Sequence, residues 1–228
     1  MINLIYKALK YISWDFKFSE ICYSQEGEDM VLQRFLGDKA NGFYIDIGAH
    51  HPIRFSNTYK FFKRGWRGIN IDAMPGSMER FRKLRKEDIN LELPLSDKKE
   101  VLNYYIFNEK ALNTFDETEA RKKDGVNGFK ITDVRSLETS TLTDVVNKYV
   151  PAGQSIDFLS IDIEGYDMKV LKSNDWNKIR PEIVLIEDLN SSIEDSLQGE
   201  QFRFMKSVDY KLIARTFNTA FYKNERKN

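Results

Sequence analysis

Acidic residues stand at or directly after five apolar runs of the sequence, where buried strands are expected to end. They are Asp46, Asp72, Asp97, Asp162 with Glu164, and Glu187 with Asp188. In open α/β sheets, ligands bind beyond the carboxyl ends of the strands. Carboxylates gathered there repel one another unless a cation or the hydroxyl groups of a ligand compensate. The acidic strand ends therefore predict a ligand site along one edge of a sheet.

The glycine pattern narrows the class of ligand. Gly48 permits a sharp turn and close approach to a ligand, and Asp72 follows at a spacing typical of an acid that binds ribose hydroxyls. The G-x-G-x-x-G pattern of dinucleotide sites is absent, since His50, His51 and Pro52 occupy that turn, and no P-loop motif occurs. A ligand with a ribose, a cationic centre and no phosphate fits best. S-adenosylmethionine has these features.

Strand-like and helix-like segments alternate along the chain, which predicts an α/β fold with a mostly parallel sheet covered by helices on both faces. Strands are expected at residues 43–48, 68–72, 89–95, 100–107, 156–162, 183–187, 210–215 and 219–223, the last two as an antiparallel pair. The fourth strand is a candidate hairpin partner of the third. Helices are expected at residues 26–36, 57–64, 77–84, 143–149, 167–171 and 201–207.

Two segments fall outside this alternation. Residues 1–22 are expected to form a helical extension, with an amphipathic helix at residues 1–12 that docks on residues 23–228 or on a second copy of the chain. Attachment to a membrane surface is the alternative. Residues 109–139 are polar, contain Gly125 and Gly128 and lack sustained periodicity. This stretch predicts an insertion or lid, with residues 113–115 contacting a sugar.

The composition excludes several classes of protein. Lys+Arg and Asp+Glu are both 35, so the charge balance gives no reason to expect a nucleic-acid partner. Cys22 is the single cysteine, which excludes an intrachain disulfide and suits a reducing cytoplasm, where we expect the protein. Two histidines make a Cys/His zinc site improbable, and no apolar run reaches the length of a transmembrane helix.

Four spaced motifs resemble FkbM-type methyltransferases over about residues 23–223. The motifs are residues 24–29 (SQEGED), 46–52 (DIGAHHP), 65–72 (GWRGINID) and 161–165 (IDIEG). The resemblance implies a Rossmann-like class I methyltransferase fold with a C-terminal antiparallel pair, S-adenosylmethionine as cofactor, and O-methylation. Many members of the family resemble enzymes that modify sugars of surface polysaccharides or secondary metabolites. A glycine often follows the first-strand motif in the family, and Pro52 departs from that pattern.

The resemblance also implies where the cofactor binds. Asp46 and Gly48, with Ala49, line its methionine end. Asp72, with Ala73, holds the ribose hydroxyls. Ser96 and Asp97 lie at the adenine, and Gln25 and Gly27 cover the cofactor, although Gln25 suits a hydrogen bond at a helix start equally well.

Methyl transfer to a sugar hydroxyl also requires removal of a proton of high pKa, for which two mechanisms remain open. In the first, Asp162 and Glu187, with Asp188, hold Mg²⁺, Mn²⁺ or Ca²⁺, which binds the acceptor hydroxyl, and Asp162 and Glu164 are catalytic. In the second, His51 or His50 is the general base. Both histidines equally suit packing or capping of the loop.

Two other functions compete with O-methylation of a sugar or glycan precursor. Residues 162–164 resemble an acid-x-acid motif of metal-dependent glycosyltransferases that use nucleotide sugars, although the chain is short for one. A non-catalytic module that retains the cofactor pocket is the other alternative. Trp66 is expected to have a structural role, in which it packs the helix at residues 57–64 against the sheet.

Overall fold

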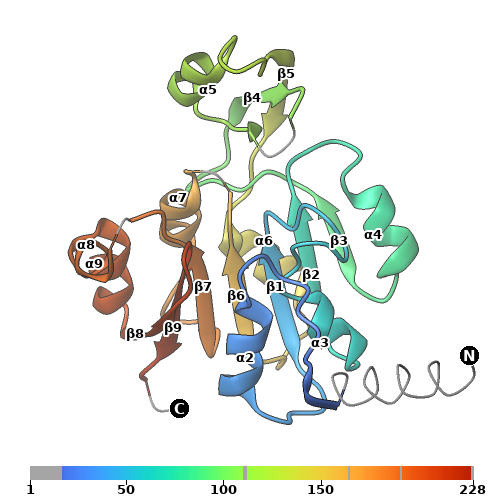
Figure 1. Cartoon of the computed structure of the whole chain (residues 1–228), viewed down its shortest axis with the longest axis vertical. Coiled ribbons are helices and arrows are strands. Elements are labelled where there is room, and N and C mark those ends of the chain that lie inside the picture. Colours follow the sequence, from blue (N-terminus) through green and yellow to red (C-terminus); the bar gives the residue numbers. More distant parts are fainter. Residues whose placement is uncertain (1–16, 110–111, 164, 191, 227–228) are drawn as a thin grey trace, which may run out of the picture.

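The computed structural model describes residues 17–109, 112–163, 165–190 and 192–226, which form a seven-stranded sheet and a separate two-stranded one (Figure 1). The large sheet has the order β3-β2-β1-β6-β7-β9-β8. Its strands are β1 (Phe43–Ile47), β2 (Arg67–Asp72), β3 (Ile89–Glu92), β6 (Phe158–Ile161), β7 (Ile183–Glu187), β8 (Tyr210–Arg215) and β9 (Thr219–Asn224). The first five strands in this list run parallel, and β9 lies antiparallel between β7 and β8. The predicted mostly parallel fold with a terminal antiparallel pair is confirmed.

Helices cover both faces of the large sheet, as the continuously apolar strands require. The helices of the described residues are α2 (Glu28–Leu36), α3 (Tyr59–Lys63), α4 (Met78–Leu84), α5 (Glu117–Lys123), α6 (Leu142–Tyr149), α7 (Asp167–Lys172), α8 (Ile193–Gln198) and α9 (Glu200–Ser207). Apolar side chains of α6, α7 and α9 pack on the face that carries Ile45 and Ile47, while α2 and α3 pack on the face that carries Tyr44. None of these described helices is long and apolar enough to cross a membrane.

The two-stranded sheet consists of β4 (Val101–Phe107) and β5 (Ile131–Glu138), which pair antiparallel. With α5 it forms a unit, here named the insert (residues 101–138), that stands beyond the carboxyl ends of the parallel strands in Figure 1. The suggested pairing of residues 100–107 with the third strand is wrong. Residues 109–139, where the sequence shows no sustained periodicity and no helix or strand was assigned, contain α5 and β5. Six of the eight β5 residues are exposed, so no alternation of apolar and polar residues marks the strand.

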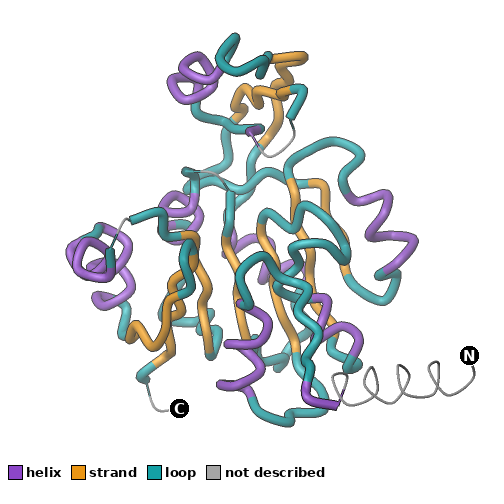
Figure 2. Tube along the Cα trace, in the orientation of Figure 1, coloured by secondary structure: helices purple, strands orange, loops and turns teal. Residues whose placement is uncertain are grey.

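The predicted helix at residues 1–12 lies outside the described residues. Most other predicted elements are confirmed with ends shifted by a few residues, and α8 was not anticipated. Figure 2 shows loops at the carboxyl ends of the strands, and loop residues there and in the insert supply much of the wall of the candidate site.

Trp66 lies at the centre of the core under α3, fully buried. Its ring centroid is 4.9 Å from that of Phe61 on α3 and 6.1 Å from that of Phe158 on β6, and its Nε1 donates to the Lys39 carbonyl at 3.1 Å. The predicted packing of this helix against the sheet through Trp66 is confirmed.

Replacing Trp66 with Ala should lower the free energy of unfolding by about 3–5 kcal/mol, because a large buried aromatic side chain leaves a cavity. Urea denaturation at fixed pH measures this, with Phe35→Ala on the more exposed side of α2 as the control of small effect. Wild-type stability in the Trp66 variant would show that the ring does not support the fold.

Candidate functional site

A cavity of about 430 Å³ lies over the carboxyl ends of β1, β2 and β6, beneath the insert. This volume is within the usual range for small-molecule sites. Its wall comes from the strand ends and the loops that follow them, from the insert, and from Gln25 before α2. Among the predicted site residues, Gln25, Gly48, Asp72, Ala73 and Asp162 line it. The cavity therefore lies at the edge of the sheet where the strand-end acids predict a ligand site.

Gly48 at the end of β1 holds two strand ends unusually close together. Its φ is +84°, and a Cβ atom there would lie 1.7 Å from the Asp162 carbonyl oxygen after β6. Its N–H and that of Ala49 both donate to the Ile71 carbonyl of β2, at 2.9 and 3.0 Å. Only glycine fits this position. The requirement comes first from the neighbouring backbone rather than from a ligand.

Asp72 ends β2 at the cavity wall, between Ile71 and Ala73. One carboxylate oxygen accepts the Met74 N–H at 2.7 Å, and burial raises the pKa of this carboxyl above its ordinary value. Leu93 and Leu95, which follow β3, add an apolar wall. A carboxylate beside an apolar wall suits a ribose with its attached base, so these residues fit S-adenosylmethionine.

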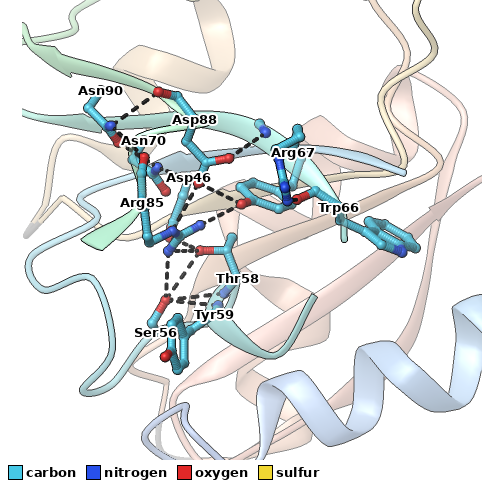
Figure 3. A network of polar contacts seen from close by, with 12 residues as sticks. Asp46, Ser56, Thr58, Tyr59, Trp66, Arg67, Asn70, Arg85, Asp88 and Asn90 are labelled. Atoms are coloured by element: carbon cyan, nitrogen blue, oxygen red, sulfur yellow. Dashed lines mark hydrogen bonds and ion pairs between the residues drawn. The ribbon is translucent and has the colours of Figure 1, made fainter. Parts of the chain in front are cut away.

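Asp46 points away from the cavity into a buried polar network beside α3 and α4 (Figure 3). Its Oδ2 accepts a hydrogen bond from Thr58 Oγ1 at 2.9 Å. Burial is the main cause that raises the pKa of Asp46 from 3.8 to about 6, while the Arg85 charge and the Thr58 hydrogen bond act in the opposite direction. Asp46 is not among the cavity-lining residues of the described chain, in contrast to the predicted contact with the methionine end of the cofactor.

Arg85 is the centre of this network and was not predicted from the sequence. Its side chain is fully buried, and Nε donates to Asp88 Oδ2 at 2.9 Å. Nη1 donates to Thr58 Oγ1 at 2.9 Å and Nη2 to Tyr44 Oη at 2.6 Å. Arg85 thus joins the end of α4 to β1 and to the start of α3.

His51 caps the loop after β1 instead of facing the cavity. Its Nδ1 accepts the backbone N–H groups of Ile53 and Arg54, at 3.1 and 3.0 Å. An accepting Nδ1 places the proton of a neutral imidazole on Nε2, so neither nitrogen is then poised to accept a substrate proton. Burial lowers the pKa of His51. These bonds favour the capping role over the role of general base, whereas His50 does line the cavity.

The remaining predicted cofactor residues lie near the cavity without lining it in the described chain. Ser96 is buried, and its Oγ donates to Oδ1 of the exposed Asp97 at 3.1 Å. Gly27 precedes α2 with a φ of +92°, and its carbonyl accepts the N–H groups of Met30 and Val31. Their contacts with the adenine and with the cofactor remain predictions.

The residues predicted to hold a divalent cation do not form a site. Asp188 is buried and forms an ion pair with Arg215 at 3.4 Å, and its Oδ1 accepts from the side chain of Asn190 at 2.5 Å. Asp162 lines the cavity, whereas Glu187 and Asp188 do not. Glu164 lies outside the described residues, and within them no cluster of three or more candidate metal-ligating side chains occurs. The predicted donor set therefore does not fit a metal.

Aromatic rings line the part of the cavity wall that the insert and the loop before α7 contribute. The Phe115 ring centroid lies 4.5 Å from that of Tyr104 on β4 and 5.6 Å from that of Tyr166 before α7. Asn113 adds an amide whose Oδ1 accepts the Phe107 N–H at 2.9 Å. These residues and Thr114 line the cavity. Residues 113–115, for which the sequence predicts contact with a sugar, are therefore all in the cavity wall, and the contact itself stays a prediction.

A mostly parallel sheet with a terminal antiparallel pair and a cavity at its strand ends is a Rossmann-like arrangement, the fold expected of an S-adenosylmethionine-dependent methyltransferase. The chain belongs to the methyltransferase FkbM domain family, whose model matches residues 46–212. The predicted family is confirmed, and it favours methyl transfer over the glycosyltransferase alternative. No protein of curated function matches the chain.

Two solved structures are similar over most of this chain. One is a TehB-like SAM-dependent methyltransferase from Corynebacterium glutamicum, with 9% identity and a TM-score of 0.42, covering 98% of this chain and 99% of that one. The other is the small RNA methyltransferase HEN1, with 10% identity and a TM-score of 0.38, covering 91% of this chain and 27% of that one.

Replacing Asp72 with Ala should weaken S-adenosylmethionine binding by roughly 1.5–3 kcal/mol, the range for a hydrogen bond to a charged group. Titration calorimetry measures the affinity. Asp97→Ala tests the predicted adenine contact separately, and Asp133→Ala on the exposed β5 strand is the control that should bind as wild type. Unchanged affinity in the Asp72 variant would remove this residue from the cofactor site.

Asp46 should make stability fall as the pH rises. Because its folded-state pKa, about 6, exceeds the ordinary 3.8, the native state binds more protons between these values, and this group's contribution declines through that window. Relative to Asp46→Asn, wild-type protein should therefore lose roughly 2 kcal/mol of unfolding free energy between pH 4 and pH 7.

Urea denaturation across this pH range tests the prediction. Thr58→Ser keeps the hydroxyl that donates to Asp46 and should follow the wild-type curve. If the wild type and Asp46→Asn run parallel from pH 4 to pH 7, the Asp46 carboxyl does not titrate in this window.

Proposed function

We propose that this methyltransferase transfers the methyl group to a hydroxyl of a sugar or glycan precursor, in the modification of a surface polysaccharide or a secondary metabolite. The observation that carries the proposal is the aromatic and amide lining contributed by the insert. Phe115, Tyr104 and Tyr166 present ring surface to the same cavity as Asn113 and Thr114. The proposed cofactor residues Gly48 and Asp72 line the same cavity from the strand ends.

Such a lining matches the two-sided chemistry of a sugar. The C–H faces of a pyranose are apolar and pack on aromatic rings, while its hydroxyls need directional donors and acceptors. Asn113 Oδ1 is engaged by the Phe107 N–H, and its Nδ2 lies 3.6 Å from Met74 Sδ, a weak acceptor. The amide group can therefore exchange a weak contact for a sugar hydroxyl.

The proposed reaction is an in-line displacement. S-adenosylmethionine supplies a methyl group already activated by its sulfonium, so the protein has to align the acceptor oxygen and remove its proton. Alignment within a water-poor site is worth roughly 7–11 kcal/mol of the barrier. Asp162 is the proposed general base, because it is a carboxylate at the end of β6 that lines the cavity next to Gly48.

A turnover screen tests this function. Radiolabelled methyl transfer from S-adenosylmethionine should appear with monosaccharide, nucleotide-sugar or oligosaccharide acceptors, and the product should be an O-methyl ether by mass spectrometry. Transfer only to non-carbohydrate acceptors would refute the sugar assignment. Cofactor binding without transfer to any acceptor would instead support the non-catalytic module.

Asp162→Asn should lower kcat by roughly 10²–10⁴, the range for loss of a general base, with little change in cofactor affinity. Asp133→Asn on the exposed face of β5 is the control and should retain full activity. Wild-type turnover in the Asp162 variant would exclude this carboxylate as the base.

A further inference from the structure

The loop between β1 and α3 brings a cation and an exposed aromatic ring to the cavity wall. Arg54 and Phe55 both line the cavity, and the guanidinium carbon of Arg54 lies 4.3 Å from the Phe55 ring centroid. Phe55 is 47% exposed. An arginine stacked on a ring keeps its edge N–H groups directed outward, in the fork geometry that matches a carboxylate or a phosphate.

This loop is fixed in an unfavourable conformation around Arg54. His50 and Phe55 have φ values of 35° and 56°, in the left-handed region that side chains other than glycine rarely adopt. His51 Nδ1 accepts the Arg54 N–H, and the Ser56 N–H donates to the Tyr23 carbonyl at 3.1 Å. Strained backbone held by such bonds is typical of functional sites.

Charge distribution in the cavity indicates where an anion binds. Asp72, Glu109 and Asp162 also line it, so its strand-end side is acidic and repels an anionic group. Among the described residues that line the cavity, Arg54 is the one lysine or arginine. It takes part in no ion pair between described residues. An oxyanion on a bound molecule is therefore favoured only beside this loop.

We propose that Arg54 binds an oxyanion, a carboxylate or a phosphate, carried by the acceptor, so that the enzyme selects an acidic sugar rather than a neutral one. This inference rests on the proposed function and adds the substrate class to it. Arg54 is exposed at the outer part of the site, whereas ligands of this fold class bind along the strand ends, where Asp72 and Gly48 lie. The acceptor is the ligand that meets Arg54, and Phe55 packs against its ring.

Titration calorimetry on the enzyme saturated with S-adenosylhomocysteine tests the proposal. The probes are glucose 1-phosphate, glucuronate and glucose, which share a ring and differ in the anionic group. Wild-type enzyme should bind at least one anionic sugar roughly 10- to 100-fold more tightly than glucose, the range for a charge-assisted hydrogen bond. The two anionic probes distinguish a phosphate site from a carboxylate site.

Arg54→Met should abolish this preference and leave the affinities for glucose and S-adenosylhomocysteine unchanged. Arg54→Lys, which keeps the charge and loses the fork, should restore part of it. Arg82→Met on α4, whose exposed guanidinium pairs with Glu92 outside the cavity, is the matched control and should behave as wild type.

Three results would overturn the proposal. They are equal binding of glucose and both anionic sugars by the wild type, a preference that survives in Arg54→Met, and weaker binding of S-adenosylhomocysteine in that variant. The last would assign Arg54 to the carboxylate of the cofactor. Anion preference that depends on Arg54, together with no methyl transfer to any sugar, would refute the proposed function while the anion site stands.

Discussion

The geometry of the candidate site depends on the hydrogen bonds and the ion pair of the buried Arg85 guanidinium. It is fully buried, so its charge must be balanced inside the protein, and Asp88 accepts its Nε while Asp46 lies one hydroxyl away through Thr58. Leaving a buried charge without its partner costs about 3–5 kcal/mol. The loop that carries the cavity wall after β1 ends at Ser56 and Thr58, and both contact Arg85. The network therefore fixes one end of that loop, and Gly48 fixes the other.

The strand-end acids illustrate what the sequence could predict and what it could not. Their positions follow from strand boundaries, and Asp72 and Asp162 do line one cavity, as local patterns predicted. The expectation that a cation or ligand hydroxyls compensate the carboxylates does not hold for Asp46 and Asp188, because arginines lie beside them. Arg85 and Arg215 are 39 and 27 residues further along the chain, respectively. Pairings over such distances depend on the completed sheet, and no local spacing encodes them.

The same reason explains the errors in the insert. β4 was identified as a strand, but its partner was placed at the third strand because neighbouring strands usually pair. The true partner, β5, is largely exposed on both faces, so it lacks the alternation by which a half-buried strand is identified. The strands of the main sheet and the helices that cover it bury apolar side chains against each other. Their hydrophobic periodicity therefore predicted these elements from the sequence. Prediction succeeded where burial imposes a pattern on the sequence.

Separate parts of the molecule consequently carry the proposed cofactor half and the proposed acceptor half of the site. Gly48 and Asp72 lie at strand ends of the main sheet, where a Cβ atom at Gly48 would clash with the Asp162 carbonyl and the Asp72 carboxylate accepts the Met74 N–H. Phe115, Asn113 and Thr114 belong to the insert, whose own apolar cluster is small and distinct from the two large clusters of the sheet. Side chains of the insert can therefore change with little cost to the free energy of the main fold. Such a division allows the acceptor to vary within a family while the geometry for the methyl donor stays fixed by the core.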